Sequence, residues 1–96
     1  MNKQELIDRV ALTTSSTKVA ARTMVEHTLA AIEHGVMRDG ETAVVNFGKF
    51  SRVHLEERVR RNPKTGAPVV VPEKHTVRFK AGEGFTALVN GERDGE

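Results

Sequence analysis

The residues with the most distinctive chemistry in this sequence form one short segment, Arg61-Asn62-Pro63-Lys64-Thr65-Gly66. Asn62-Pro63 initiates a turn, Gly66 tolerates a positive φ, and Thr65 can hydrogen-bond across the turn. The segment therefore predicts a hairpin tip that projects a rigid apolar ring among positive charges. That combination suits contact with DNA far better than it suits catalysis.

Elsewhere, the residue types used in catalysis and metal binding lack suitable partners. The hydroxyl residues 15–17 are better placed to cap a helix than to act as nucleophiles, because no partner base is indicated. Glu56 and Glu57 are adjacent, so on a strand they point to opposite faces and make a poor acid–base pair. The chain has no cysteine, and no two histidines have a spacing that suggests zinc by itself: His27, His34, His54 and His75. We expect no enzyme activity, no metal and no cofactor.

The charge of the chain is unevenly distributed. The overall net charge is only +2, but residues 1–48 carry −1, residues 49–80 carry +6 and residues 81–96 carry −3. The positive charge is thus concentrated on the stretch that contains the expected hairpin tip. This is the distribution expected for contacts with phosphates, although a solvated basic hairpin would show it too.

Two runs of residues flank the tip, both containing valine, and predict the legs of a projecting arm. The runs are 58–61 and 67–72, and the second contains Pro68 and Pro72, which cannot donate to an inner ladder. Legs of six or seven residues would reach on the order of 20 Å, comparable with the width of a duplex. An arm of this length could reach around DNA.

The first forty residues predict two helices joined by a short turn. Asn2 followed by Glu5 forms a capping-box pattern, and the first helix should run from about Lys3 to Thr13. Cap-forming residues at 14–17 precede a longer amphipathic helix that ends at Asp39-Gly40. The two helices predict a helical hairpin.

The second half changes to β-branched and aromatic residues, which are typical of strands. Residues 43–45 and 49–55 predict two strands around the tight turn Asn46-Phe47-Gly48, and residues 76–80 alternate as a third. A short final helix and a disordered acidic tail are expected at residues 82–89 and 91–96. A chain of 96 residues buries only roughly 60–65% of its unfolded surface, so dimerisation would help it considerably.

Several short sequence motifs occur within this predicted order of helices, strands and arm. They are Met1-Asn2-Lys3, Leu6-Ile7-Asp8, Phe47-Gly48, Phe50, Arg58, Arg61-Asn62-Pro63, Thr65-Gly66, Phe79 and Gly82. Together they resemble the bacterial histone-like HU and integration host factor family over residues 1–90. The resemblance implies an α+β fold in an intertwined dimer, with a helical-hairpin base, an antiparallel β-sheet saddle and two projecting β-hairpin arms. The implied parts are the hairpin 2–38, the sheet 41–57 and 76–80, the arm 58–75, the helix 82–89 and the tail 91–96.

The resemblance also implies how DNA is held. Each arm would lie in the minor groove of double-stranded DNA, where Pro63 would insert between base pairs and kink the duplex. Phe47, Phe50 and Phe79 would belong to the core of the dimer. The expected DNA-binding residues lie on the arm and beside the body: Arg58, Arg60, Arg61, Asn62, Pro63, Lys64, Gly66, Lys3, Arg52, Lys74, Arg78 and Lys80.

Four positions depart from the usual pattern of the family. Asn46 and Arg60 stand where glycine is common, Leu55 where a basic residue is frequent, and Glu83 where lysine is usual. Asn46 could change how the backbone approaches a phosphate, and Arg60 adds charge to the arm. Leu55 and Glu83 remove cations from the flanks of the body. We therefore expect a shorter wrapped length of DNA than in a typical member.

Three functions remain open at this point. The first is a histone-like protein of low sequence specificity that bends and compacts DNA in the cytoplasmic nucleoid. The second is a site-selective bender like integration host factor, and the third is a dimeric module that binds protein or RNA. The opening of the chain favours a homodimer, although a heterodimer with a paralogue is possible. No membrane partner or small-molecule substrate is expected.

Overall fold

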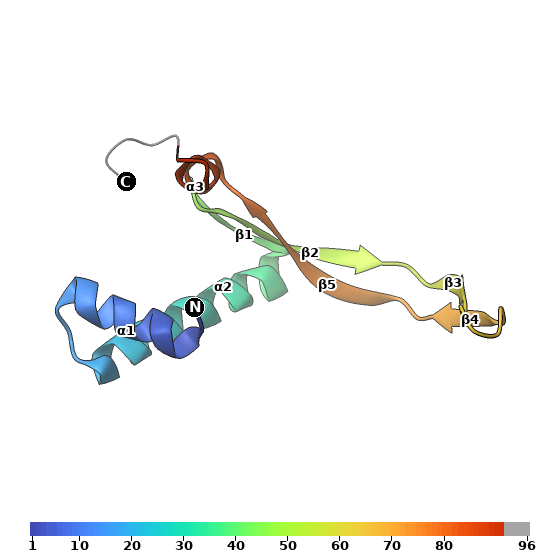
Figure 1. Cartoon of the computed structure of the whole chain (residues 1–96), viewed down its shortest axis with the longest axis horizontal. Helices are drawn as coiled ribbons and strands as arrows, with labels where there is room; N and C mark the ends of the chain where they lie inside the picture. Colours follow the sequence, from blue (N-terminus) through green and yellow to red (C-terminus); the bar gives the residue numbers. More distant parts are fainter. Residues whose placement is uncertain (92–96) are drawn as a thin grey trace.

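The computed structural model describes residues 1–91, and the chain folds into a helical hairpin, a small sheet, a long arm and a short last helix (Figure 1). Helix α1 spans Lys3–Thr14 and α2 spans Lys18–Asp39. The expected acidic tail lies, from residue 92 onward, outside the described residues. The longest dimension is 57 Å, and the arm accounts for this length.

Local capping explains the ends of both long helices. The side chain of Asn2 accepts a hydrogen bond from the backbone N–H of Glu5 at 2.9 Å, and Thr17 accepts one from Ala20 at 3.1 Å. Ser15 and Gly40 adopt positive φ values of 53° and 89° at the two C-termini. These caps satisfy backbone groups that a helix leaves unpaired, which confirms the predicted helical hairpin. Its small core consists of Ile7, Ala11, Ala21 and Val25.

Three antiparallel strands form the body sheet in the order β1-β2-β5. Strand β1 spans Glu41–Val44, β2 spans Gly48–Leu55 and β5 spans Lys74–Ala81. The first strand was predicted at 43–45, but Val45 belongs to the turn, where Asn46 has a positive φ of 64°. The third strand starts two residues earlier than the pattern indicated. Lys74 and His75, expected in the arm, pair instead with β2.

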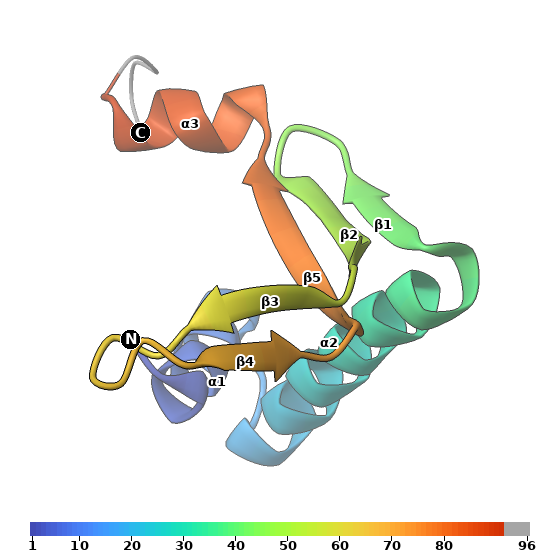
Figure 2. The same ribbon diagram turned by 90° about the vertical axis from the view of Figure 1, so that its right-hand side faces the viewer.

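The arm continues the ribbon made by β2 and β5. Its strands β3, Arg58–Arg61, and β4, Pro68–Val71, pair antiparallel. Each leg is interrupted by two residues, 56–57 on one leg and 72–73 on the other. Because the two interruptions have the same length, the pairing resumes in the same register. Figures 1 and 2 show one long hairpin that twists strongly at this interruption, so that the arm turns across the direction of the body strands.

Helix α3, Glu83–Val89, packs on the turn between β1 and β2. The N–H of Gly82 donates to the carbonyl of Phe47 at 2.8 Å, and that of Phe85 donates to the carbonyl of Asn46 at 2.9 Å. A Cβ atom built at Gly82 or Gly84 would lie 2.9 Å from atoms of Asn46. The close approach of the helix to the turn therefore requires glycine at both positions.

A third glycine allows the sheet to cross α2. A Cβ atom at Gly35 would collide with Oγ1 of Thr42, the hydroxyl that donates to the carbonyl of Ile32 at 3.1 Å. Gly35 is intermediate in burial and lies inside a continuous helix. Glycine at this position thus serves close packing of β1 against the helix, at a cost in helix propensity of about 1 kcal/mol.

We predict that Gly35→Ala destabilises the protein even though alanine is the better helix former. Overpacking against Thr42 should exceed the propensity gain and leave a net loss of about 1–2 kcal/mol. Urea unfolding at fixed protein concentration measures the change. The matched control is Gly35→Ala in a Thr42→Ala background, where the collision is absent and the loss should disappear. Equal losses in both backgrounds would contradict this account of Gly35.

Candidate nucleic-acid interface

The tip of the arm is held by its own hydrogen bonds. Oδ1 of Asn62 accepts from the N–H of Lys64 at 2.8 Å and from that of Thr65 at 3.4 Å. Nη1 of Arg61 donates to the carbonyl of Gly66 at 2.9 Å, and Gly66 has a φ of 71°. The side chain of Asn62 thus replaces backbone partners in the turn, as expected for asparagine.

Pro63 lies at the apex of this loop and is exposed. It is flanked by Asn62, whose N–H donates to the carbonyl of Ala67 at 2.9 Å and so closes the loop on the opposite leg. The ring is therefore presented at the end of a preformed turn. A rigid apolar group in this position can enter a gap between base pairs with little loss of conformational entropy.

Strand alternation divides the cations of the arm between its two faces. Arg58 and Arg60 share one face of the arm with Val69 and Val71, whereas Arg61 is on the other face. None of the ion pairs within residues 1–91 involves Arg58, Arg60 or the exposed Lys64 in the loop. These side chains are therefore available for an anionic partner, while the guanidinium of Arg61 also supports the turn.

A second group of cations lies on the body sheet, on the face opposite α2. Alternation along β2 and β5 places Lys49, Lys74, Arg78 and Lys80 on this face, which we call the outer face. Lys49 and Lys80 are directly opposite each other, an arrangement that is unfavourable for like charges. Nζ of Lys49 also lies 3.9 Å from a carboxylate oxygen of Glu41. A bound polyanion would relieve the repulsion.

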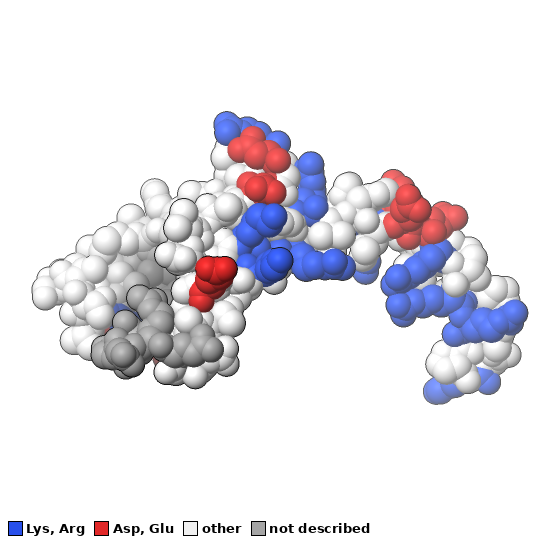
Figure 3. Space-filling model, turned by 90° about the horizontal axis from the view of Figure 1, so that it is seen from above, with Lys and Arg blue, Asp and Glu red and all other residues white. Residues whose placement is uncertain are grey.

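Figure 3 shows Lys and Arg side chains gathered over the body and again along the arm, with an acidic cluster between the two groups. The acidic residues at this junction are Glu56 and Glu57 on one leg and Glu73 on the other. The positive surface of the body and that of the arm are therefore separated by acidic residues at the base of the arm.

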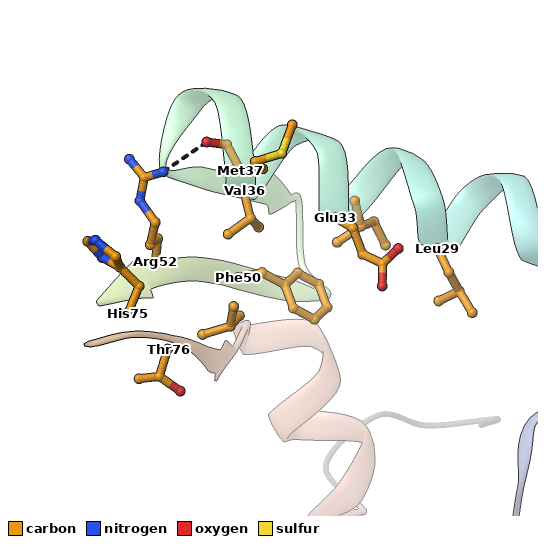
Figure 4. A pocket seen from close by; sticks show the side chains of 10 residues that line it. Leu29, Glu33, Val36, Met37, Phe50, Arg52, His75 and Thr76 are labelled. Carbon is orange, nitrogen blue, oxygen red and sulfur yellow. Dashed lines mark hydrogen bonds between the residues drawn. The ribbon is translucent and has the colours of Figure 1, made fainter. Parts of the chain in front are cut away.

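Two expected phosphate ligands have other partners. Arg52 has the same alternation as Phe50 and faces α2, where its Nη1 donates to the carbonyl of Met37 at 2.8 Å (Figure 4). Nζ of Lys3 lies 3.3 Å from Oε2 of Glu26 and joins α1 to α2. Both remain exposed, but the structure separates them from the outer face, and Arg52 caps the C-terminal end of α2.

Comparison with known proteins agrees with this geometry. Residues 1–90 match the family described as bacterial DNA-binding protein. The chain belongs to this family. It is 39% identical over 84 residues to DNA-binding protein HU-alpha of Vibrio cholerae, a match that covers 86% of this chain and 92% of that relative.

Solved structures show the same fold. The protein chain of the Anabaena HU–DNA cocrystal structure matches with a TM-score of 0.82 and 35% identity, covering 93% of this chain and 97% of that one. A mutant of HU from Thermotoga maritima matches with a TM-score of 0.64 and 26% identity, covering 93% and 99%. The HU resemblance inferred from the motifs and the predicted α+β fold are both confirmed. The chain is a histone-like DNA-binding protein, and its partner is double-stranded DNA.

Lys49 is the cation of the outer face that the motifs did not reveal. Strand alternation could have indicated it from the sequence. Lys49 is one residue from Phe50, which faces the helix, so Lys49 faces the opposite side of the sheet. The same parity rule places Arg52 with Phe50 and Val77, on the helix side.

Within residues 1–91, no cluster of His, Asp and Glu could hold a metal ion, and no helix is long and apolar enough to cross a membrane.

We predict different effects for two charge-neutralising variants of β2. Lys49→Gln should make the log–log salt dependence of DNA binding shallower by roughly 0.9 for each phosphate that the side chain no longer neutralises. Arg52→Gln should leave this slope unchanged and lower the free energy of unfolding by about 0.5–1 kcal/mol, because the helix end loses its cation. Fluorescence anisotropy at several salt concentrations and urea unfolding measure the two quantities. The reverse pattern would place the DNA on the other face of the sheet.

Proposed function

We propose that this chain is an architectural protein that bends and compacts duplex DNA with little sequence specificity. The observation that carries the proposal is the preformed tip, in which Asn62 and Arg61 hold the turn and leave Pro63 exposed at its apex. The arm would lie in the minor groove and Pro63 would unstack one base step. Unstacking costs a few kcal/mol, which contacts with the bent flanks must offset.

The phosphate contacts would come from both positive groups. On the arm they are Arg58, Arg60 and Lys64, and on the outer face they are Lys49, Lys74, Arg78 and Lys80. Contacts with phosphates position a protein on DNA but do not read its sequence. This composition supports a general compacting role in the bacterial nucleoid, without a catalytic step.

We further propose that two copies of this chain form the functional unit. A groove of about 500 Å³ lies between α2 and the inner face of the sheet, and it is lined by Leu29, Val36, Phe50 and Val77, among others (Figure 4). Leu29 is 40% exposed and Phe79 is 42% exposed, which is unusual for large apolar side chains in so small a protein. A second copy would bury this apolar face and complete the core.

The aromatic cluster supports the same proposal. The rings of Phe47, Phe50, Phe79 and Phe85 lie with neighbouring centroids 4.7–6.4 Å apart, yet Phe47 is 45% exposed. Aromatic clusters of this kind dominate core energetics only when water is excluded from them. The cluster is therefore half of a core whose other half a partner subunit would supply.

The path of DNA beyond the sheet is proposed to be short. Leu55 pairs with Lys74 and so occupies a position on the outer face that a cation could fill. Glu83 lies exposed in the first turn of α3 and adds negative charge beside the body. Fewer flanking cations would attract less of the duplex on either side of the bend.

The proposed bending is tested with Pro63→Ala. Energy transfer between the ends of a duplex of about three helical turns should rise when the unmodified protein binds and should stay low with the variant. Anisotropy should show that the variant still binds, with affinity reduced by at most about tenfold, because the cationic contacts remain. The matched control is Pro68→Ala in β4 of the same arm, which should bend DNA normally. Bending by Pro63→Ala would contradict proline insertion.

The proposed dimer is tested with Leu29→Asp in the groove. A carboxylate buried between subunits should cost about 3 kcal/mol or more and shift the protein to a monomer that unfolds at lower temperature. Analytical ultracentrifugation and thermal unfolding measure these changes. Leu12→Asp is the control, since Leu12 is 69% exposed on α1 and should tolerate the charge. A dimer unaffected by Leu29→Asp would show that the groove faces solvent.

A further inference from the structure

The groove between α2 and the inner face of the sheet contains two fixed charges of opposite sign. Glu33 lines it from α2 and Arg52 lines it from β2, and both are exposed in one chain. The other lining residues are apolar, apart from His75 and Thr76. A charge that is covered by an apolar surface is costly unless it finds a partner of opposite sign. A chain that covers this groove must therefore bring a cation to Glu33 and an anion to Arg52.

Neither charge is satisfied by an ion pair within its own chain. The ion pairs in the described part of the chain include neither Glu33 nor Arg52. Nη1 of Arg52 donates to the carbonyl of Met37 at 2.8 Å, and a guanidinium has further N–H donors. Figure 4 shows the two charged side chains in different parts of the groove, with Val36 and Phe50 between them. Both charges therefore remain available to a partner subunit.

The arrangement of the two charges is self-complementary. In a dimer with a two-fold axis the same surface contacts itself, so a contact between two different residues occurs twice, once in each direction. A two-fold axis through the apolar middle of the groove, near Val36 and Phe50, exchanges its two ends. Glu33 of each copy would then meet Arg52 of the other. A second copy of this chain thus supplies both of the charges that the groove requires.

We propose that Glu33 and Arg52 select a second copy of this chain as the partner subunit. This inference rests on the proposed dimer. A paralogous chain that lacks one of the two charges leaves its counterpart unpaired in the interface, and a chain with a like charge at that position repels it. Charges across an interface determine the choice of partner more than the affinity, and repulsion of wrong partners is a common source of specificity. The two residues therefore favour the homodimer over a heterodimer with such a paralogue.

The test uses two variants that each reverse one charge, Glu33→Lys and Arg52→Glu. When either variant pairs with itself, like charges meet at both ends of the groove, so the dissociation constant of the dimer should rise by at least about tenfold. In the mixed dimer the new lysine meets the new glutamate, and Arg52 of one chain meets Glu33 of the other. The two variants should therefore form mixed dimers well above the statistical proportion.

Equimolar amounts of the two variants, one with a tag that changes its mass, are refolded together from urea, and native mass spectrometry measures the three kinds of dimer. Refolding the mixture keeps the test valid if one variant does not fold by itself. Local effects cancel, such as the lost hydrogen bond to the carbonyl of Met37, because a variant chain carries them in every dimer that it forms. The matched control pairs Glu5→Lys with Arg9→Glu, which are exposed on α1 outside the groove and should assort statistically.

Statistical assortment of Glu33→Lys with Arg52→Glu would overturn the proposed selection and leave the dimer itself intact. The same holds if each variant pairs with itself as tightly as the unmodified chain does. An unmodified protein that sediments as a monomer would instead overturn the proposed dimer, and this inference with it. All of these results are independent of DNA binding, which anisotropy measures on the unmodified protein.

Discussion

The antiparallel pairing of β2 with β5 is the interaction on which the rest of the structure depends. Its register decides which side chains share a face, and the same register continues into β3 and β4. One face of the ribbon therefore carries Phe50 and Phe79 toward α2, while the other carries Lys49 and Lys80 outward. A slip of one residue would exchange these faces, exposing the aromatic rings and burying the cations, so the apolar face strongly specifies the register. The position of the cationic outer face is thus a consequence of the packing of the core.

The sequence predicted those parts of the molecule that depend on local chemistry. The tip is correct because Asn62 and Gly66 determine the turn through their own conformational preferences, and the helix ends follow from Asn2, Thr17 and Gly40. The early start of β5 could not be read in this way, since Lys74 and His75 are polar and join the strand only through their partners in β2.

Nonlocal pairing also explains the site residues that were missed or placed elsewhere. A count of cations treats Lys49 and Arg52 alike, and only alternation relative to Phe50 separates the outer face from the helix side. Gly35 belongs to the same class, because its reason is the position of Thr42 and not the helix that contains it.

The two halves of the molecule obtain their order from different sources. The arm has no buried residue, and its shape comes from backbone pairing and from the hydrogen bonds of Asn62 and Arg61. The body relies on apolar burial, yet its groove and aromatic cluster remain partly exposed in one chain. A change at the exposed positions of the arm can therefore leave stability unaltered, whereas a change on the inner face alters the packing on which stability depends. This separation follows from the ribbon itself, because its outer end extends beyond every element that could cover it.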